Sequence, residues 1–111
     1  MDTRTSYRHI IENILTDYAS VPYAYSDIEQ QTIFDRDGDH YLVMLVGRDG
    51  IRRVHGCLVH IDLVDGKAYI QRDGTEVGIA TMLMRDGIPK EHIVLAFRSP
   101  ELRRHTDFAV A

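Results

Sequence analysis

The fold is decided by the stretch RRVHGCLVHIDLVDGKAYIQR, residues 52–72. The first half is rich in apolar and β-branched residues, the second carries the apolar run Ala68-Tyr69-Ile70, and Asp65-Gly66 separates them. An Asp-Gly pair between two such runs is a strong hairpin signal, because both residues accept the positive φ angles of a tight turn. The sequence therefore predicts two antiparallel strands, over 52–64 and 67–72, at the centre of a small sheet.

Two more strands are predicted before this hairpin, over 29–34 and 40–46. An acidic turn containing Gly38 joins them, and a second Asp-Gly turn at Asp49-Gly50 leads into the central hairpin. Four strands joined in chain order by short turns form an antiparallel meander. Because the run 40–46 is apolar at almost every position, we expect this strand to be covered on both faces of the sheet.

A long helix is predicted at the N-terminus, ending before Pro22 because proline cannot donate into the helix ladder. Glu12 lies on its polar side, where we expect it to face solvent. The apolar side follows the helical period. It consists of Tyr7, Ile10, Ile11, Ile14, Leu15 and Tyr18.

A short helix and one more buried strand, over 93–97, are predicted after the meander. No linker, repeat or low-complexity segment interrupts the chain, so we expect one domain over residues 1–111. The predicted fold class is α+β: an antiparallel meander sheet with a long N-terminal helix and a C-terminal helix-strand unit.

The charge balance argues against a DNA-binding protein that acts by itself. Thirteen Lys and Arg residues stand against seventeen Asp and Glu residues, which gives a net charge of -4. DNA-binding proteins are usually basic, because contacts to phosphate dominate their affinity. A role at DNA would therefore be indirect, through a protein partner.

Cysteine usage and hydropathy indicate the cellular setting. With Cys57 as its single cysteine, the chain forms no internal disulfide, which fits a reducing cytoplasm. No apolar run reaches the roughly 18 residues that a membrane-spanning helix requires. We expect a cytoplasmic protein with no membrane association.

His60 and Asp62 form a possible polar pair, since residues two apart in a strand share a face. They could be a base with its orienting carboxylate, two metal ligands, or a hydrogen-bonded pair on a partly buried sheet face. The local sequence offers no third ligand, so we expect no metal. By the same alternation, His55 should lie on the opposite face of the sheet.

Cys57 should share an apolar face of its strand with Val59, Ile61 and Leu63. A catalytic thiolate needs exposure and a positive neighbour, so we expect a small buried hydrophobic residue here. No glycine-rich phosphate-binding motif is present. The sequence predicts no catalytic residues and no cofactor.

Basic and aromatic residues are the candidates for binding a partner or nucleic acid. Arginines clamp phosphates or carboxylates, and loop tyrosines stack on bases or contact a partner. Solvated strand ends, and rings packed over the sheet edge, explain the same residues without a binding role. The candidates are Arg52, Arg53, His55, Tyr23, Tyr25, Arg103 and Arg104.

The chain resembles the XisI family over nearly its whole length. The resemblance is carried by Arg52-Arg53-Val54-His55-Gly56, by Asp73-Gly74-Thr75-Glu76, by residues 87–97 and by the ending 100–111. XisI proteins are small cyanobacterial proteins named for controlling the excision of a DNA element that interrupts a nitrogen-fixation operon. The resemblance implies an XisI-like fold, and the family has no established catalytic residues to carry over.

The resemblance also implies a partner. Members act with a site-specific recombinase and with XisH-type proteins, which resemble endonucleases. We therefore expect a non-enzymatic controlling factor for programmed DNA element excision, acting through one of these proteins. A direct DNA-binding module, an inhibitor or antidote of a nuclease-like partner, and a small hydrolase using His60 and Asp62 remain alternatives. We also expect a homodimer, because an apolar sheet edge such as 93–97 needs cover.

Overall fold

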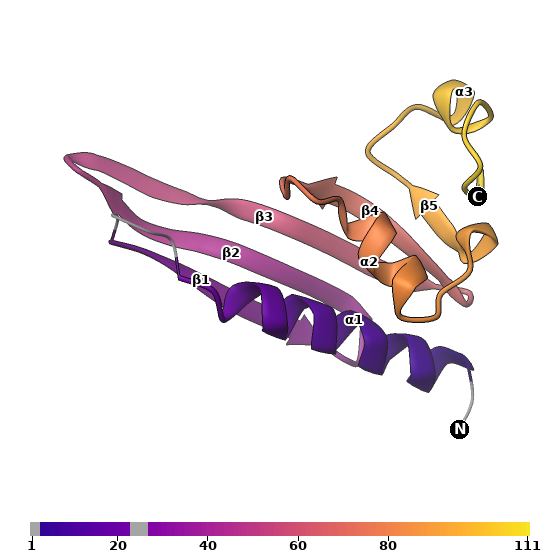
Figure 1. Ribbon diagram of the computed structural model, residues 1–111, viewed down its shortest axis with the longest axis horizontal. Coiled ribbons are helices and arrows are strands. Elements are labelled where there is room, and N and C mark those ends of the chain that lie inside the picture. Colours follow the sequence, from indigo (N-terminus) through magenta and orange to yellow (C-terminus); the bar gives the residue numbers. More distant parts are fainter. Residues whose placement is uncertain (1–2, 23–26) are drawn as a thin grey trace.

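The computed structural model describes residues 3–22 and 27–111. Its strands form one five-stranded sheet in the order β1-β2-β3-β4-β5 (Figure 1). The first four make the predicted antiparallel meander, and β5 adds to β4 in parallel. The α+β fold class is thereby confirmed. The strands are β1 (Asp27–Asp35), β2 (His40–Asp49), β3 (Arg52–Val64), β4 (Lys67–Asp73) and β5 (Ile93–Leu95).

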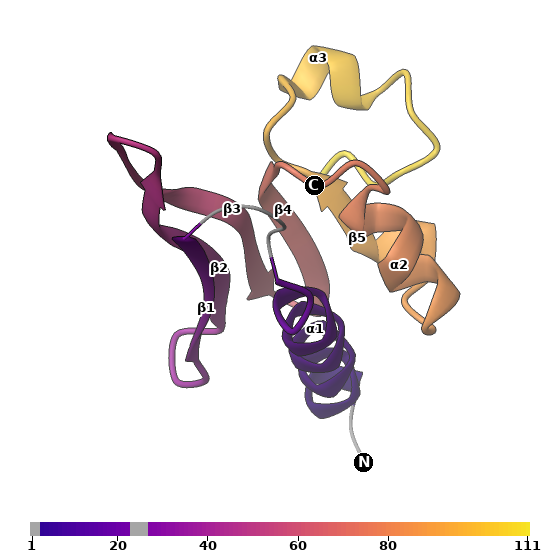
Figure 2. The same ribbon diagram turned by 60° about the vertical axis from the view of Figure 1, so that its left-hand side comes forward.

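The long helix α1 (Thr3–Ala19) and the short helix α2 (Ile79–Arg85) lie on the same face of the sheet (Figure 2). A 3-10 turn, η1 (Lys90–His92), leads into β5, and α3 (Pro100–Arg103) follows it. None of the helices in the described ranges is long and apolar enough to cross a membrane.

The hydrophobic core lies between these helices and the sheet. The predicted apolar side of α1 packs inward, with Ile11 and Leu15 fully buried. On the sheet, the core side chains alternate along each strand, as expected where one face is buried. They include Tyr41, Val43, Val59, Ile61, Ala68 and Ile70.

The opposite face of the sheet is covered by no helix of the described residues (Figure 2). Leu42, Met44 and Val46 of β2 belong to this face and are only partly buried. The prediction that this strand is covered on both faces is therefore wrong. The run 40–46 is apolar at almost every position because one face of this strand lies in the core and the other face is apolar but only partly buried.

A β-bulge at Leu58 changes the alternation along β3. Val43 of β2 pairs with Val59, but Met44 pairs with Cys57, so Leu58 is an extra residue on β3. Residues of β3 that precede the bulge therefore lie on the sheet face opposite the one that strict alternation, counted back from Val59, predicts.

Two predictions fail for that reason. Opposed residues in an antiparallel pair share a face, and His55 lies opposite Val46, whereas Cys57 lies opposite Met44. Both therefore share the uncovered face with His60. His55 is not on the opposite side, and Cys57 is not part of the Val59 stripe.

Ion pairs tie α1 to the β1–β2 turn. Asp39 is 3% exposed, and its carboxylate accepts hydrogen bonds from Arg4 Nε at 2.8 Å, Arg8 Nη2 at 3.0 Å and the Tyr41 hydroxyl at 2.7 Å. A buried carboxylate needs such partners, because an unpaired charge in the interior is costly. The turn therefore fixes the position of the helix as well as reversing the chain.

Glu12 is buried and does not face solvent as predicted. Its carboxylate accepts two hydrogen bonds from Arg36, from Nε at 2.9 Å and from Nη2 at 2.8 Å. This forked geometry matches the planar guanidinium to the planar carboxylate. The partner comes from the β1–β2 turn, so the helical pattern by itself gave no sign of it.

The C-terminal segment covers the edge of the sheet. The predicted strand over 93–97 ends at Leu95, and Ala109 forms a parallel bridge with Val94. The Ala109 N–H donates to the Ile93 carbonyl at 2.9 Å. The chain itself therefore protects the apolar edge that was our reason to expect a homodimer, and dimerisation stays a prediction without that support.

Candidate functional site

Three polar side chains meet on the uncovered face of the sheet. His40 of β2 pairs directly with Asp62 of β3, and His60 precedes Asp62 by two positions on the same strand. The Asp62 Oδ1 atom lies 2.6 Å from His40 Nδ1 and 2.8 Å from His60 Nε2. The two imidazole rings meet edge-on, with centroids 6.3 Å apart. These residues form the His-His-Asp cluster.

The cluster is built around an ionised carboxylate. Burial acts to raise the pKa of Asp62, but hydrogen bonds from His40 and His60 outweigh it and hold that pKa below its ordinary value. The hydrogen bond to Asp62 raises the pKa of His40. Gln71 Nε2 donates to the second carboxylate oxygen, Oδ2, at 3.3 Å. The Asp62 side chain is 16% exposed and His40 is 49% exposed, so the cluster opens to solvent on one side.

Chemically, the cluster combines donor types that bind metal ions or move protons. Its three ligand atoms, two imidazole nitrogens and one carboxylate oxygen, all lie within 4.8 Å of one another.

The sequence identified His60 and Asp62 as a pair but missed His40. If β2 and β3 paired regularly from the hairpin turn, where Asp49 pairs with Arg52, His40 would lie opposite Ile61. The bulge at Leu58 shifts the register by one residue, so that His40 lies opposite Asp62.

The predicted basic residues do not form one patch. Arg52 and Arg53 begin β3 at the tip of the β2–β3 hairpin, whereas Arg103 and Arg104 lie at α3, toward the other end of the molecule (Figures 1 and 2). The Arg103 side chain is hydrogen-bonded within the fold, since its Nε donates to the Arg98 carbonyl at 3.0 Å and its Nη1 donates to the Val110 carbonyl at 2.8 Å. The four arginines therefore make no shared phosphate-binding surface.

The remaining predicted binding residues divide into two cases. His55 is exposed on the uncovered sheet face, on the same strand as His60 but outside the cluster. Tyr23 and Tyr25 lie outside the described residues.

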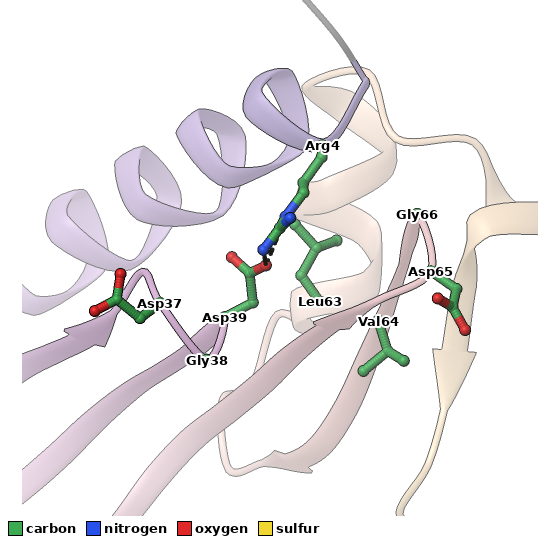
Figure 3. A pocket seen from close by; sticks show the side chains of 8 residues that line it. All are labelled: Arg4, Asp37, Gly38, Asp39, Leu63, Val64, Asp65 and Gly66. Carbon is green, nitrogen blue, oxygen red and sulfur yellow. Dashed lines mark hydrogen bonds and ion pairs between the residues drawn. The ribbon is translucent and has the colours of Figure 1, made fainter.

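A pocket of about 470 Å³ lies where the β1–β2 and β3–β4 turns approach the start of α1 (Figure 3). Arg4 reaches into it toward Asp39, whereas the carboxylates of Asp37 and Asp65 point away from that pair. Because Asp39 is already bound by Arg4, Arg8 and Tyr41, its carboxylate is not free for a ligand.

Known proteins resemble this chain along its full length. The sequence matches the XisI protein family over residues 1–110. The crystal structure of a XisI-like protein from Anabaena variabilis ATCC 29413 is 37% identical, with a TM-score of 0.90, over 97% of this chain and 99% of that one. No curated protein matches.

A second crystal structure from the same organism is described as fdxN element excision controlling factor XisI. It is 33% identical, with a TM-score of 0.85, over 99% of this chain and 100% of that one. The sequence match and the two structures agree on the whole length and the whole fold. The chain therefore belongs to the XisI family.

Proposed function

We propose that this protein is a non-enzymatic accessory factor that controls the excision of a DNA element by binding a protein partner. The observation that carries the proposal is family membership over the whole chain, together with a similar structure described as an excision controlling factor. An accessory role also fits the site, where the conspicuous polar group is a hydrogen-bonded cluster on an open face rather than a substrate cleft.

Charge and geometry support a protein partner over direct DNA binding. The net charge is -4, and the arginine pairs lie at separate ends of the fold. The Arg52 Nη2 atom also lies 3.7 Å from Asp49 Oδ2, so the aspartate partly offsets the charge of this arginine. An acidic protein complements a basic partner that itself binds DNA. We propose an XisH-type, nuclease-like protein as that partner, with a site-specific recombinase as the second candidate.

The uncovered sheet face is the surface that we assign to the partner. Ile33 of β1 lies directly opposite Leu42 of β2 on this face and is 49% exposed. Met44 and Val46 continue the apolar strip along β2. A contiguous apolar strip rimmed by polar groups is typical of an interface with another protein.

Co-expression with the XisH-type protein, followed by size-exclusion chromatography with light scattering, tests the proposal. We expect a stable complex that Ile33→Glu weakens, because a charge in an apolar interface must be desolvated. The matched control is Val77→Glu, which changes an exposed apolar residue outside the strands and should leave the complex intact.

Separate elution of the two wild-type proteins would contradict an XisH-type partner. A complex with the recombinase in the same assay would then support the second candidate. Loss of the partner's nuclease activity inside a stable complex would favour the inhibitor or antidote alternative. DNA binding by the isolated protein, with a steep dependence on salt, would favour the direct DNA-binding module.

A further inference from the structure

We propose that the His-His-Asp cluster is a binding site for one divalent transition-metal ion, with Zn²⁺ as the best-suited metal. The proposal concerns this chain by itself and does not depend on the partner. Its basis is that His40, His60 and Asp62, from two adjacent strands, bring three ligand atoms within 4.8 Å of one another on the uncovered face. Imidazole nitrogen and carboxylate oxygen are both ordinary zinc ligands.

Two of the three distances between the ligand atoms are already close to the spacing that a zinc ion requires. Zinc binds nitrogen and oxygen at about 2.0–2.2 Å, so tetrahedral ligand atoms lie about 3.3 Å from one another. Asp62 Oδ1 is now 2.6 Å from His40 Nδ1 and 2.8 Å from His60 Nε2. An ion that replaces these two hydrogen bonds needs each histidine nitrogen to move about 0.5–0.7 Å away from Asp62 Oδ1 and the two nitrogens, now within 4.8 Å of each other, to reach the same spacing, which side-chain rotations supply.

Neighbouring groups hold the ligands in place. Gln71 Nε2 donates to Asp62 Oδ2 at 3.3 Å, which orients the carboxylate and leaves Oδ1 directed at the histidines. The His40 ring lies against Gly38, where a Cβ atom would come within 2.8 Å of His40 Cδ2. Hydrogen bonds and contacts of this kind fix the orientation of metal ligands and are a large part of metal affinity.

The cluster supplies three protein ligands and opens to solvent on the fourth side. His40 and His60 have side chains 49% and 32% exposed, whereas Asp62 is largely buried beneath them. Three protein ligands with one open position are typical of zinc sites that hold a water molecule or accept a donor from another molecule. A metal here would therefore present an open coordination position on the uncovered face.

The test is a titration of metal-stripped protein, purified without a polyhistidine tag, with Co²⁺ and Zn²⁺. We expect visible absorption bands of four-coordinate Co²⁺ that saturate at one ion per chain and disappear when Zn²⁺ is added. Isothermal titration calorimetry with Zn²⁺ should give the same stoichiometry. Wild-type protein that shows no saturable binding at micromolar Zn²⁺ would overturn the proposal.

Variants assign the ligands. His40→Ala, His60→Ala and Asp62→Asn should each abolish the Co²⁺ bands, and Gln71→Leu should weaken Zn²⁺ binding by about 10-fold or more. The matched control is His55→Ala, which removes an exposed histidine from the same strand and face but outside the cluster. Circular dichroism confirms that each variant folds. Unchanged affinity in folded His40→Ala and Asp62→Asn, or equal loss in His55→Ala, would show that the metal binds elsewhere.

Discussion

His40 and Asp62 lie directly opposite each other on β2 and β3, and His40 Nδ1 is 2.6 Å from Asp62 Oδ1. This relationship depends on a single extra residue, Leu58, which bulges out of the ladder 4 positions before Asp62. β-Bulges commonly re-aim side chains in this way. The same bulge brings His55 and Cys57 to the uncovered face.

The reactivity of Cys57 tests the effect of the bulge. Its thiol is partly buried and donates to the Val59 carbonyl at 3.2 Å, and burial raises its pKa. We expect native protein to react completely with a disulfide reagent such as DTNB, but about 10-fold or more slowly than protein in denaturant, because the thiolate is the reactive form.

The control for that experiment is the dependence of the rate on urea. A partly buried thiol that still reaches solvent on the uncovered face reacts from the native state, so low urea concentrations should leave its rate nearly constant. A rate that rises in step with the unfolded fraction would place Cys57 in the core and contradict the bulged register.

Asp39→Asn should destabilise the fold by about 2 kcal/mol, because it removes the charge that Arg4 and Arg8 bind in a buried position. Asp39 has φ 57°, a conformation that asparagine also accepts, so the substitution leaves the turn unstrained. The measurement is urea unfolding at neutral pH. Asp37→Asn, in the same turn but exposed, is the matched control and should change stability by less than about 0.5 kcal/mol. Equal effects of the two substitutions would refute the role of the Asp39 ion pairs.

Glu12→Gln should reduce the loss of stability in acid. Hydrogen bonds from Arg36 hold the pKa of Glu12 below its ordinary value of 4.5. A carboxyl group with a lowered folded pKa contributes stability above the unfolded pKa and loses it as pH falls through the folded pKa. The stability difference between wild type and Glu12→Gln should therefore be largest at neutral pH and shrink below about pH 4.

The free energy of urea unfolding, measured from pH 7 to pH 3, gives this difference directly. Glu101→Gln, which changes an exposed carboxylate in α3, is the control and should follow the wild-type curve. A constant difference between wild type and Glu12→Gln across the pH range would show that Glu12 acts through packing rather than through its charge.

Gly47→Ala should be strongly destabilising, on the order of 2–4 kcal/mol. Gly47 has φ 151°, and a Cβ atom there would lie 2.0 Å from the Asp27 carbonyl oxygen on the neighbouring strand β1. Gly56→Ala on β3 is the matched control, since a Cβ atom at that position meets nothing within 4 Å. Thermal unfolding should show a large fall in Tm for Gly47→Ala and little change for Gly56→Ala. Similar Tm values for the two variants would contradict the close approach of β1 and β2.

Much of the fold could be predicted from local sequence pattern. The helical period of Ile11 and Leu15 identified the buried side of α1, and the Asp-Gly turn at Asp65-Gly66 joined β3 to β4 as expected. These features depend on residues near one another in the chain, where backbone geometry sets the spacing. The pair of His60 and Asp62 was found for the same reason.

The predictions that were wrong all concern contacts between residues that are distant in the sequence. Arg36 lies 24 positions from Glu12 in the sequence, and Ala109 forms its parallel bridge with Val94 across the intervening α3 segment. Whether a helix covers one face of β2 or both is likewise decided by packing.

The sequence by itself determined the elements, their order and the buried side of α1, because hydrophobic periodicity and turn chemistry act over a few residues. Only the tertiary structure decided that His40 joins His60 and Asp62. That outcome rests on where the ladder between β2 and β3 accommodates one extra residue. Packing both Tyr41 and Ile61 into the same core requires the bulge, and no local pattern in either strand specifies it.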